Sequence, residues 1–271
     1  MFKALYARMR QGYRTIQFPK AKPPELPDRF RGRPVFQTSR CPEGCTVCID
    51  TCPVGAISSS VISSGAISGG NALLMDLGKC LFCTDCDRAC PEHAISFQND
   101  YRLSVRARDD LILSEKDTAL RLAHELDASM KRLFGRSLKL RQVSAGGCNA
   151  CEADVNVLGT IGWDLGRFGI QFVASPRHAD GLLITGPVTR NMEVALKKAY
   201  DAVPDPKIVI AVGACAISGG PFSGHPEAND GALSMLPVDL FIPGCPPHPL
   251  TILDGLLRLL GKIDDERINR L

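Results

Sequence analysis

Twelve cysteines in 271 residues constrain this chain more than any other feature. Eight of them lie between Cys41 and Cys90, in two groups that each end in a Cys-Pro dipeptide, CPEGCTVCIDTCP and CLFCTDCDRACP. The N-terminus MFKALYARMRQGYR lacks the apolar core of a secretory signal, and no apolar run is long enough to span a membrane. We therefore expect a cytosolic, globular protein with reduced thiols. Clustered cysteines then indicate metal ligands or catalytic groups rather than disulfides.

The second group has the spacing C-x2-C-x2-C-x3-C-P, which resembles the run of bacterial ferredoxins. In that run three cysteines bind one 4Fe–4S cluster and the fourth binds the other, so the spacing predicts two crossed ligand sets. One set is Cys41, Cys45, Cys48 and Cys90, and the other is Cys80, Cys83, Cys86 and Cys52. The first group departs from the run by one residue before Cys45, which a loop containing Pro42 and Gly44 can absorb. The alternative is two structural zinc sites, which suit four cysteines each but fit the repeated Cys-Pro ending poorly.

The sequence after each group also repeats, as CPVGAISSS and CPEHAISFQ. Each A-I-S segment predicts a strand that closes one half of a pseudo-symmetric domain. Residues 58–71, rich in Ser and Gly, predict a hairpin or an exposed loop, and the apolar LLMDLG that follows predicts another strand.

The pattern changes after these groups, which indicates a domain boundary. Residues 114–134 place apolar side chains at helical spacing behind Ser114, with Asp117 three residues on, and predict an amphipathic connecting helix. Five strand-like runs follow, at residues 138–144, 170–175, 181–186, 207–213 and 239–244, with helix-like runs from about 150, over 192–203 and over 249–261. This alternation predicts an α/β fold with an open, flavodoxin-like parallel sheet and helices on both faces.

The expected organisation therefore has four parts. Residues 1–37 form an extended basic and proline-rich strap, 38–108 a two-cluster ferredoxin-like α+β domain, 109–136 the connecting helix, and 137–271 the α/β domain.

The remaining four cysteines each follow a predicted strand of the α/β domain: Cys148, Cys151, Cys215 and Cys245. The carboxyl ends of parallel strands meet at one edge of the sheet, so these thiols predict a third 4Fe–4S cluster there. Nearby glycines let the backbone approach the sulfurs. The alternative is that Cys215 and Cys245 are buried packing residues, although both lie in loop segments.

Segments in both halves of the sequence resemble a known family of proteins. The segments GGCNACEAD, DPKIVIAVGACAISGGPF and VDLFIPGCPPHP are similar to the small subunit of membrane-bound group 4 NiFe hydrogenases and to its homologue in respiratory complex I. The segments FPKAKPPELPDRFRGRP and MDLGKCLFCTDCDRACP resemble the two-cluster subunit of formate hydrogenlyases and complex I. The chain looks like a fusion of two adjacent subunits, which implies three 4Fe–4S clusters and a large subunit that holds the catalytic metal centre.

The first cysteine pair separates the branches of this family. Subunits of the complex I branch resemble one another in having two adjacent cysteines at this place, whereas hydrogenase small subunits have C-x-x-C. In this sequence Asn149 and Ala150 separate the two cysteines. This favours an electron-transfer subunit of a membrane-bound, cytosol-facing hydrogenase. The alternatives are the equivalent subunit of a nickel-free or complex I-like assembly that reduces quinone or another acceptor, and a free-standing three-cluster electron carrier. Glu152 and Asp154 follow the pair and are candidates for a proton relay, or else for capping the helix that follows.

Charge adds an expectation about partners. Residues 1–40 carry ten Lys or Arg against Glu25 and Asp28, although the whole chain has a net charge of only +3. We expect this segment to lie extended on another subunit, with its helix-like start against a membrane-arm subunit or anionic head groups. An upstream donor subunit or ferredoxin is a further expected partner. Nucleic acid is not, because no binding motif accompanies the charge.

Overall fold

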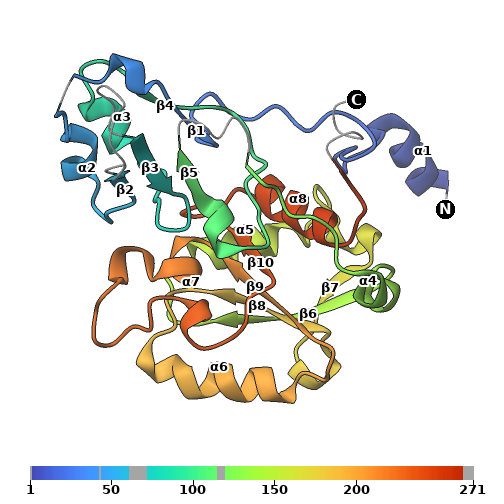
Figure 1. The fold of residues 1–271 in the computed structure, drawn as a ribbon. Helices are drawn as coiled ribbons and strands as arrows, with labels where there is room; N and C mark the ends of the chain where they lie inside the picture. Colours follow the sequence, from blue (N-terminus) through green and yellow to red (C-terminus); the bar gives the residue numbers. More distant parts are fainter. Residues whose placement is uncertain (1, 43, 61–71, 115–119, 265–271) are drawn as a thin grey trace.

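The computed structural model describes residues 2–42, 44–60, 72–114 and 120–264, which form three main parts and a connecting segment at residues 120–137 (Figure 1). An N-terminal extension (residues 2–33) leads into a small cysteine-rich unit (34–60 and 72–114). The larger sheet unit (138–264) follows. None of the helices among the described residues has both the length and the apolarity of a membrane span.

The sheet unit is built on five parallel strands. They are β6 (Leu138–Ser144), β7 (Ile170–Phe172), β8 (Gly181–Thr185), β9 (Ile208–Val212) and β10 (Leu240–Ile242), in the spatial order β7-β6-β8-β9-β10. This is the flavodoxin-like order, in which the connection changes direction between β6 and β8. The predicted open parallel sheet is confirmed, and the carboxyl edge between β6 and β8 is where such folds bind ligands.

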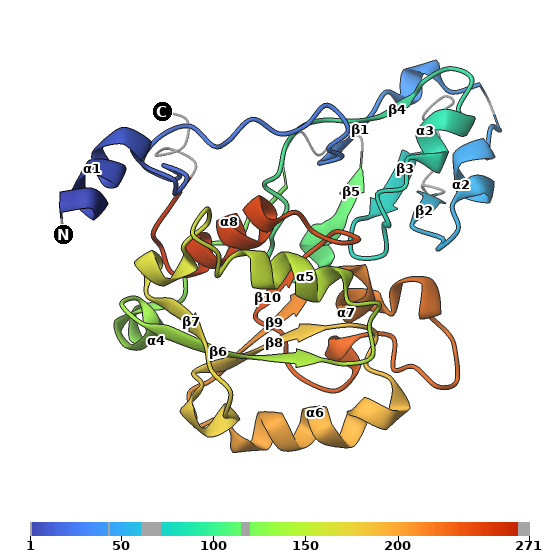
Figure 2. The same ribbon diagram turned by 180° about the vertical axis from the view of Figure 1, so that it is seen from behind.

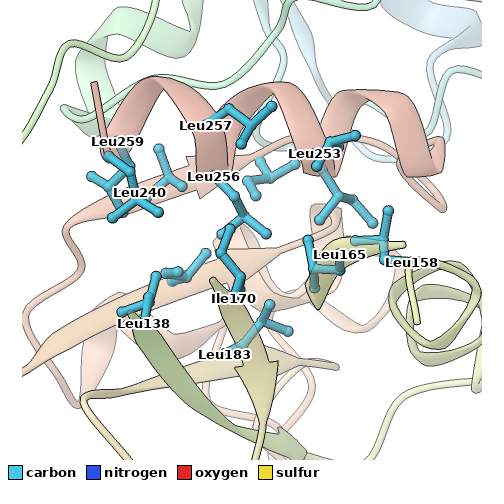
Figure 3. Close-up of a cluster of buried hydrophobic side chains, with 14 of the residues drawn as sticks. Leu138, Leu158, Leu165, Ile170, Leu183, Leu240, Leu253, Leu256, Leu257 and Leu259 are labelled. Carbon is cyan, nitrogen blue, oxygen red and sulfur yellow. The ribbon is translucent and has the colours of Figure 1, made fainter. Parts of the chain in front are cut away.

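Helices cover both faces of this sheet, as predicted. Figures 1 and 2 show α5 (Ala150–Val157) and α8 (Pro249–Leu259) on one face and α6 (Arg190–Ala202) on the other. Alternate residues of a strand point to opposite faces, so Leu183 packs under α8 while Leu182 packs towards α6, and neither is exposed. Figure 3 shows the leucines of α8 over β6, β8 and β10.

The cysteine-rich unit has two small antiparallel sheets. In the first, β1 (Pro34–Phe36) pairs with β4 (Ile95–Phe97); the second has the order β2 (Ile57–Ser60), β3 (Ala72–Asp76), β5 (Ile112–Ser114). Both predicted A-I-S strands are present, as β2 and β4. Residues 61–71 of the predicted loop lie outside the described residues. Two short helices, α2 (Val47–Thr51) and α3 (Asp85–Ala89), complete the unit.

The predicted connecting helix over 109–136 is wrong for most of the residues described there, and residues 115–119 of this prediction lie outside the described residues. Residues 112–114 form β5, which pairs with β3, so the cysteine-rich unit extends past residue 108; helix α4 covers only Ala128–Phe134. Its cap is Asp127, whose carboxylate accepts hydrogen bonds from the N–H groups of Ser129 and Met130. Residues 120–127 are not helical, because Ala123 donates to the carbonyl of Ser104 and Leu126 to that of Leu259. Three of the apolar side chains expected on one helix face, Leu120, Ala123 and Leu126, are instead buried from this non-helical segment, whereas Leu133 lies in α4 and is 56% exposed.

The N-terminal extension begins with the predicted helix, α1 (Phe2–Gln11), and then runs along the sheet unit of its own chain. Phe18 is only 1% exposed and belongs to the same core cluster as α8. Arg167 donates to the carbonyls of Ile16 and Phe18, each at 2.7 Å. The expectation that this segment lies on another subunit is therefore wrong for the residues around Phe18.

Short helices complete the description. They are α7 (Ala214–Ser218) and the 3-10 segments Thr38–Arg40, Arg108–Leu111, Leu165–Phe168, Pro176–His178, Gly220–Phe222 and Ala232–Ser234.

Candidate iron–sulfur sites

Four short helices each begin next to a cysteine. Four cysteines occupy the second position of a short helix: Cys48 in α2, Cys86 in α3, Cys151 in α5 and Cys215 in α7. The first N–H groups of a helix have no partner within it, so a thiolate at this position lies beside donors that stabilise its charge. Before α3 and α5, Thr84 and Asn149 adopt positive φ angles of 66° and 70°, which turn the chain between the paired cysteines.

The first thiol set is Cys41, Cys45, Cys48 and Cys90, as predicted from the spacing. Burial raises the pKa of Cys48, and repulsion from the other three thiolates of the set raises it further. The fold thus brings these four side chains together although Cys90 is far from the others in sequence.

The second thiol set is Cys52, Cys80, Cys83 and Cys86. Burial raises the pKa of Cys80 to about 12, against a hydrogen bond from the N–H of Phe82, and the other three thiolates add to the increase. The two crossing cysteines have matching environments: Ala56 donates to Cys52 Sγ at 3.2 Å and Ala94 to Cys90 Sγ at 3.4 Å. The sequence repeat after each Cys-Pro therefore produces the same N–H···S bond twice.

The third thiol set, Cys148, Cys151, Cys215 and Cys245, lies at the carboxyl edge of the sheet. Burial raises the pKa of Cys151 well above its usual range, with repulsion from the other three thiolates and from Glu152. A Cβ added to Gly213 would lie 2.5 Å from Cys151 Sγ, so only glycine leaves room for that sulfur. Cys148 and Cys245 are exposed, which leaves one side of the set open on this chain.

The three sets lie in series. Repulsion from Cys48 of the first set raises the pKa of Cys86 in the second set. Repulsion from Cys83 of the second set likewise raises the pKa of Cys245 in the third set. The second set is therefore the middle one.

The donors suit iron–sulfur clusters. Burial also raises the pKa of Cys86 to about 12 and, together with neighbouring thiolates, that of Cys215 to about 11, so without a bound cation these thiols stay protonated at neutral pH. Cationic metal would displace those protons.

The two candidate relay residues differ in environment. Glu152 is 5% exposed, and its Oε1 accepts hydrogen bonds from Ser144 at 2.6 Å and Thr185 at 2.7 Å. Burial would raise the pKa of Glu152, but these hydroxyls and its own N–H hold it below the usual value. Burial raises the pKa of Asp154, which lines a cavity of about 280 Å³ together with Cys245.

Sequence reasoning missed Ser144 and Thr185, the hydroxyl partners of Glu152. They are the last residues of β6 and β8, the strands that flank the change of direction in the sheet, and their Cα atoms are paired in register. The sequence did contain a signal for this pair, because a residue with a hydroxyl group lies at or next to the end of each of these two strand-like runs.

A second missed group joins the two units near the second and third thiol sets. Arg108 donates to both oxygens of Asp76, at 2.8 and 2.6 Å, and Asp76 also accepts from the N–H of Gly78. The carbonyl of Gly78 in turn accepts from Ser218, the last residue of α7, at 2.8 Å. We call these four residues the junction network; it connects the loop before Cys80 to the helix that carries Cys215.

Two histidines of the sheet unit, His248 and His178, differ in environment. His248 caps α8: its Nδ1 accepts from the N–H of Leu250, burial lowers its pKa, and its ring contacts Phe30 and Trp163 edge-on. His178 is exposed at the end of a 3-10 turn.

Known proteins resemble the sheet unit most clearly. Residues 148–259 match the family model described as NADH ubiquinone oxidoreductase, 20 Kd subunit. This match begins at the first cysteine of the third thiol set and leaves the cysteine-rich unit outside it.

Three relatives show which kinds of protein this chain is similar to. A probable membrane-bound hydrogenase subunit mbhJ of Pyrococcus furiosus is 44% identical over 136 residues, covering 50% of this chain and 81% of the relative. The B subunit of NADH-quinone oxidoreductase from Clostridium beijerinckii is 46% identical over 172 residues, covering 62% and 93%. Formate hydrogenlyase subunit 7 of Escherichia coli is 43% identical over 141 residues, but only 55% of that protein is covered.

Proposed function

Since this chain belongs to the family of the 20-kDa subunit of NADH ubiquinone oxidoreductase, we propose that it is the electron-transfer subunit of a membrane-bound, cytosol-facing NiFe hydrogenase of the formate hydrogenlyase type. It is an oxidoreductase subunit whose catalytic centre lies on a partner. In this proposal three 4Fe–4S clusters supply one-electron carriers between a donor and that centre.

The serial arrangement of the thiol sets is the observation that carries the proposal. The first set lies at one end, the second adjoins both others, and the third lies at an open sheet edge with two exposed thiols. A donor subunit or ferredoxin fits the first set, and a large subunit fits the third. Such a series serves electron flow in either direction.

In this proposal the residues of the chain bind the clusters and shield part of them from water. Helix N-termini and the N–H groups of Ala56, Phe82 and Ala94 face the sulfurs, and such hydrogen bonds tune a cluster's reduction potential. Four of the eight cysteines in the first two sets are buried and shielded from water: Cys48, Cys80, Cys86 and Cys90. Asp154, whose pKa is raised, is a better proton relay in this proposal than Glu152, whose carboxylate is held ionised by two hydroxyls.

A second candidate is an assembly without nickel that passes electrons to quinone or another acceptor. It is favoured by the NADH-quinone oxidoreductase relative, whose alignment covers more of this chain than the hydrogenase alignments do. Against it stands the C-x-x-C spacing of Cys148 and Cys151, which resembles the hydrogenase branch.

Metal analysis of the intact complex tests the proposal. The complex is purified without oxygen through a tag on this chain, and its metals are measured relative to this subunit. Nickel equimolar with the chain, with iron in excess of the roughly twelve atoms of three clusters, is the expected result, followed by hydrogen turnover. Iron without nickel would reject the hydrogenase and leave the second candidate, to be tested by quinone reduction.

A further inference from the structure

Helix α1 exposes an apolar stripe that nothing in the described chain covers. Phe2, Leu5, Tyr6 and Met9 follow the i, i+3, i+4, i+7 spacing of one helix face, and they are 58–85% exposed. No residue of α1 is buried. A single exposed apolar side chain is ordinary, but four on one face indicate a surface that another phase or molecule covers.

Cations flank this stripe. Lys3, Arg8 and Arg10 lie in the same helix, and residues 1–24 contain six Lys or Arg and no Asp or Glu. An acidic protein surface would match the charge but not the apolar stripe, and an apolar protein surface would match the stripe but leave the cations unpaired. The interface of an anionic bilayer offers both, with acyl chains below and phosphate groups at the level of the cations.

The helix is also held in a fixed place on the molecule. Just beyond it, Thr15 donates to the carbonyl of Ile161 at 2.9 Å and Ile16 to that of Gly162 at 2.9 Å. Ile161 is itself 70% exposed, so the anchoring loop adds an apolar side chain beside the helix. In both Figure 1 and Figure 2, α1 projects at the end of the molecule opposite the cysteine-rich unit.

We infer that α1 is an interfacial helix that lies in the surface of an anionic membrane, with Phe2, Leu5, Tyr6 and Met9 inserted among the acyl chains. The tyrosine combines an apolar ring with a polar hydroxyl, which suits the head-group level. One short helix gives weak, reversible binding, so it supplements the attachment provided by partner subunits. This membrane contact is independent of the proposed electron-transfer role of the chain.

Vesicle flotation of the full-length, cluster-loaded chain tests this inference. The chain is expected to float with vesicles containing phosphatidylglycerol, and much less with pure phosphatidylcholine. The double variant Leu5→Gln/Met9→Gln keeps helix-forming residues and the charge but removes two inserted side chains. It should bind at least about thirtyfold more weakly. Arg8→Gln/Arg10→Gln should lose roughly tenfold or more, and only on anionic vesicles.

The matched control is Leu133→Gln/Val194→Gln, which changes two exposed apolar residues on α4 and α6. It should float like the wild type, and the absorption of the iron–sulfur clusters should be unchanged in every variant. Equal flotation of wild type and Leu5→Gln/Met9→Gln would overturn the inference. Failure of the wild type to float with anionic vesicles would also overturn it. If the Leu5→Gln/Met9→Gln variant then dissociates from the purified complex, the stripe is covered by another subunit.

Discussion

The cysteine-rich unit and the sheet unit hold thiols in opposite ways. In the first, Cys48, Cys80 and Cys86 are themselves members of the hydrophobic core, and the surrounding sheets have only two and three strands. In the second, the two core clusters contain no cysteine, and the thiol set lies at the edge of a five-stranded sheet. Under the proposed function, iron would therefore be part of the hydrophobic core in the cysteine-rich unit, whereas in the sheet unit it would bind at the edge of a core that is complete without it.

Removal of iron gives the largest expected difference between the units. Anaerobic chelation should leave buried, protonated thiols in the core of the cysteine-rich unit, and amide exchange in β3 and β5 should become at least about a hundredfold faster. Strands β8 and β9 should stay protected, because each fully buried Leu or Ile under α8 contributes about 1.5–3 kcal/mol without iron. Hydrogen exchange measured by mass spectrometry checks this, and equal loss of protection in both units would break the comparison.

Gly213→Ala should affect only the sheet unit. The new Cβ would lie 2.5 Å from Cys151 Sγ, at a residue whose φ is 89°. We expect iron content to fall by about one third, from roughly twelve atoms to eight, with the folded sheet retained by circular dichroism. Gly224→Ala is the control, because Gly224 also has positive φ (75°) but nothing within 4 Å of the added atom. Loss of iron from all three sets would show that the units do not load independently.

Ser218→Ala should give the smallest effect, at the boundary between the units. It removes the hydrogen bond to the carbonyl of Gly78, and an unpaired buried acceptor costs about 1–3 kcal/mol. The loop before Cys80 should then be held less firmly against α7, and we expect a weaker magnetic interaction between the clusters of the second and third sets by electron paramagnetic resonance. Ser234→Ala is matched to it, since Ser234 also donates to backbone carbonyls but lies outside the junction network. A spectrum identical to that of the wild type would exclude the junction network from positioning the clusters.

The sheet could be predicted because its information is local. Each strand is a short apolar run and each helix has its own periodicity, so their alternation indicates a parallel sheet covered on both faces. The grouping of the thiols could also be predicted, because the second cysteine group has the ferredoxin-like spacing with a crossing fourth cysteine, and because strand ends meet at one edge of a parallel sheet.

The errors arose where distant residues decide the conformation. Leu120, Ala123 and Leu126 have helical spacing, yet their segment is not helical, because the N–H groups of Ala123 and Leu126 donate to the carbonyls of Ser104 and Leu259, which lie near only after folding. The junction network and the burial of Phe18 likewise join residues more than thirty positions apart. No local pattern encodes such contacts.

Phe18 has one further consequence. It places residues before the cysteine-rich unit in the core of the sheet unit, so the smaller unit is inserted between two segments of the larger one and is tethered covalently at both ends. A unit joined by one linker can swing about it, whereas two attachment points leave little rotational freedom. The packing of Phe241 and Ile217 in the core of the cysteine-rich unit restricts that freedom further. Electron transfer between the units would then proceed at a fixed separation, without a docking step and without dependence on protein concentration.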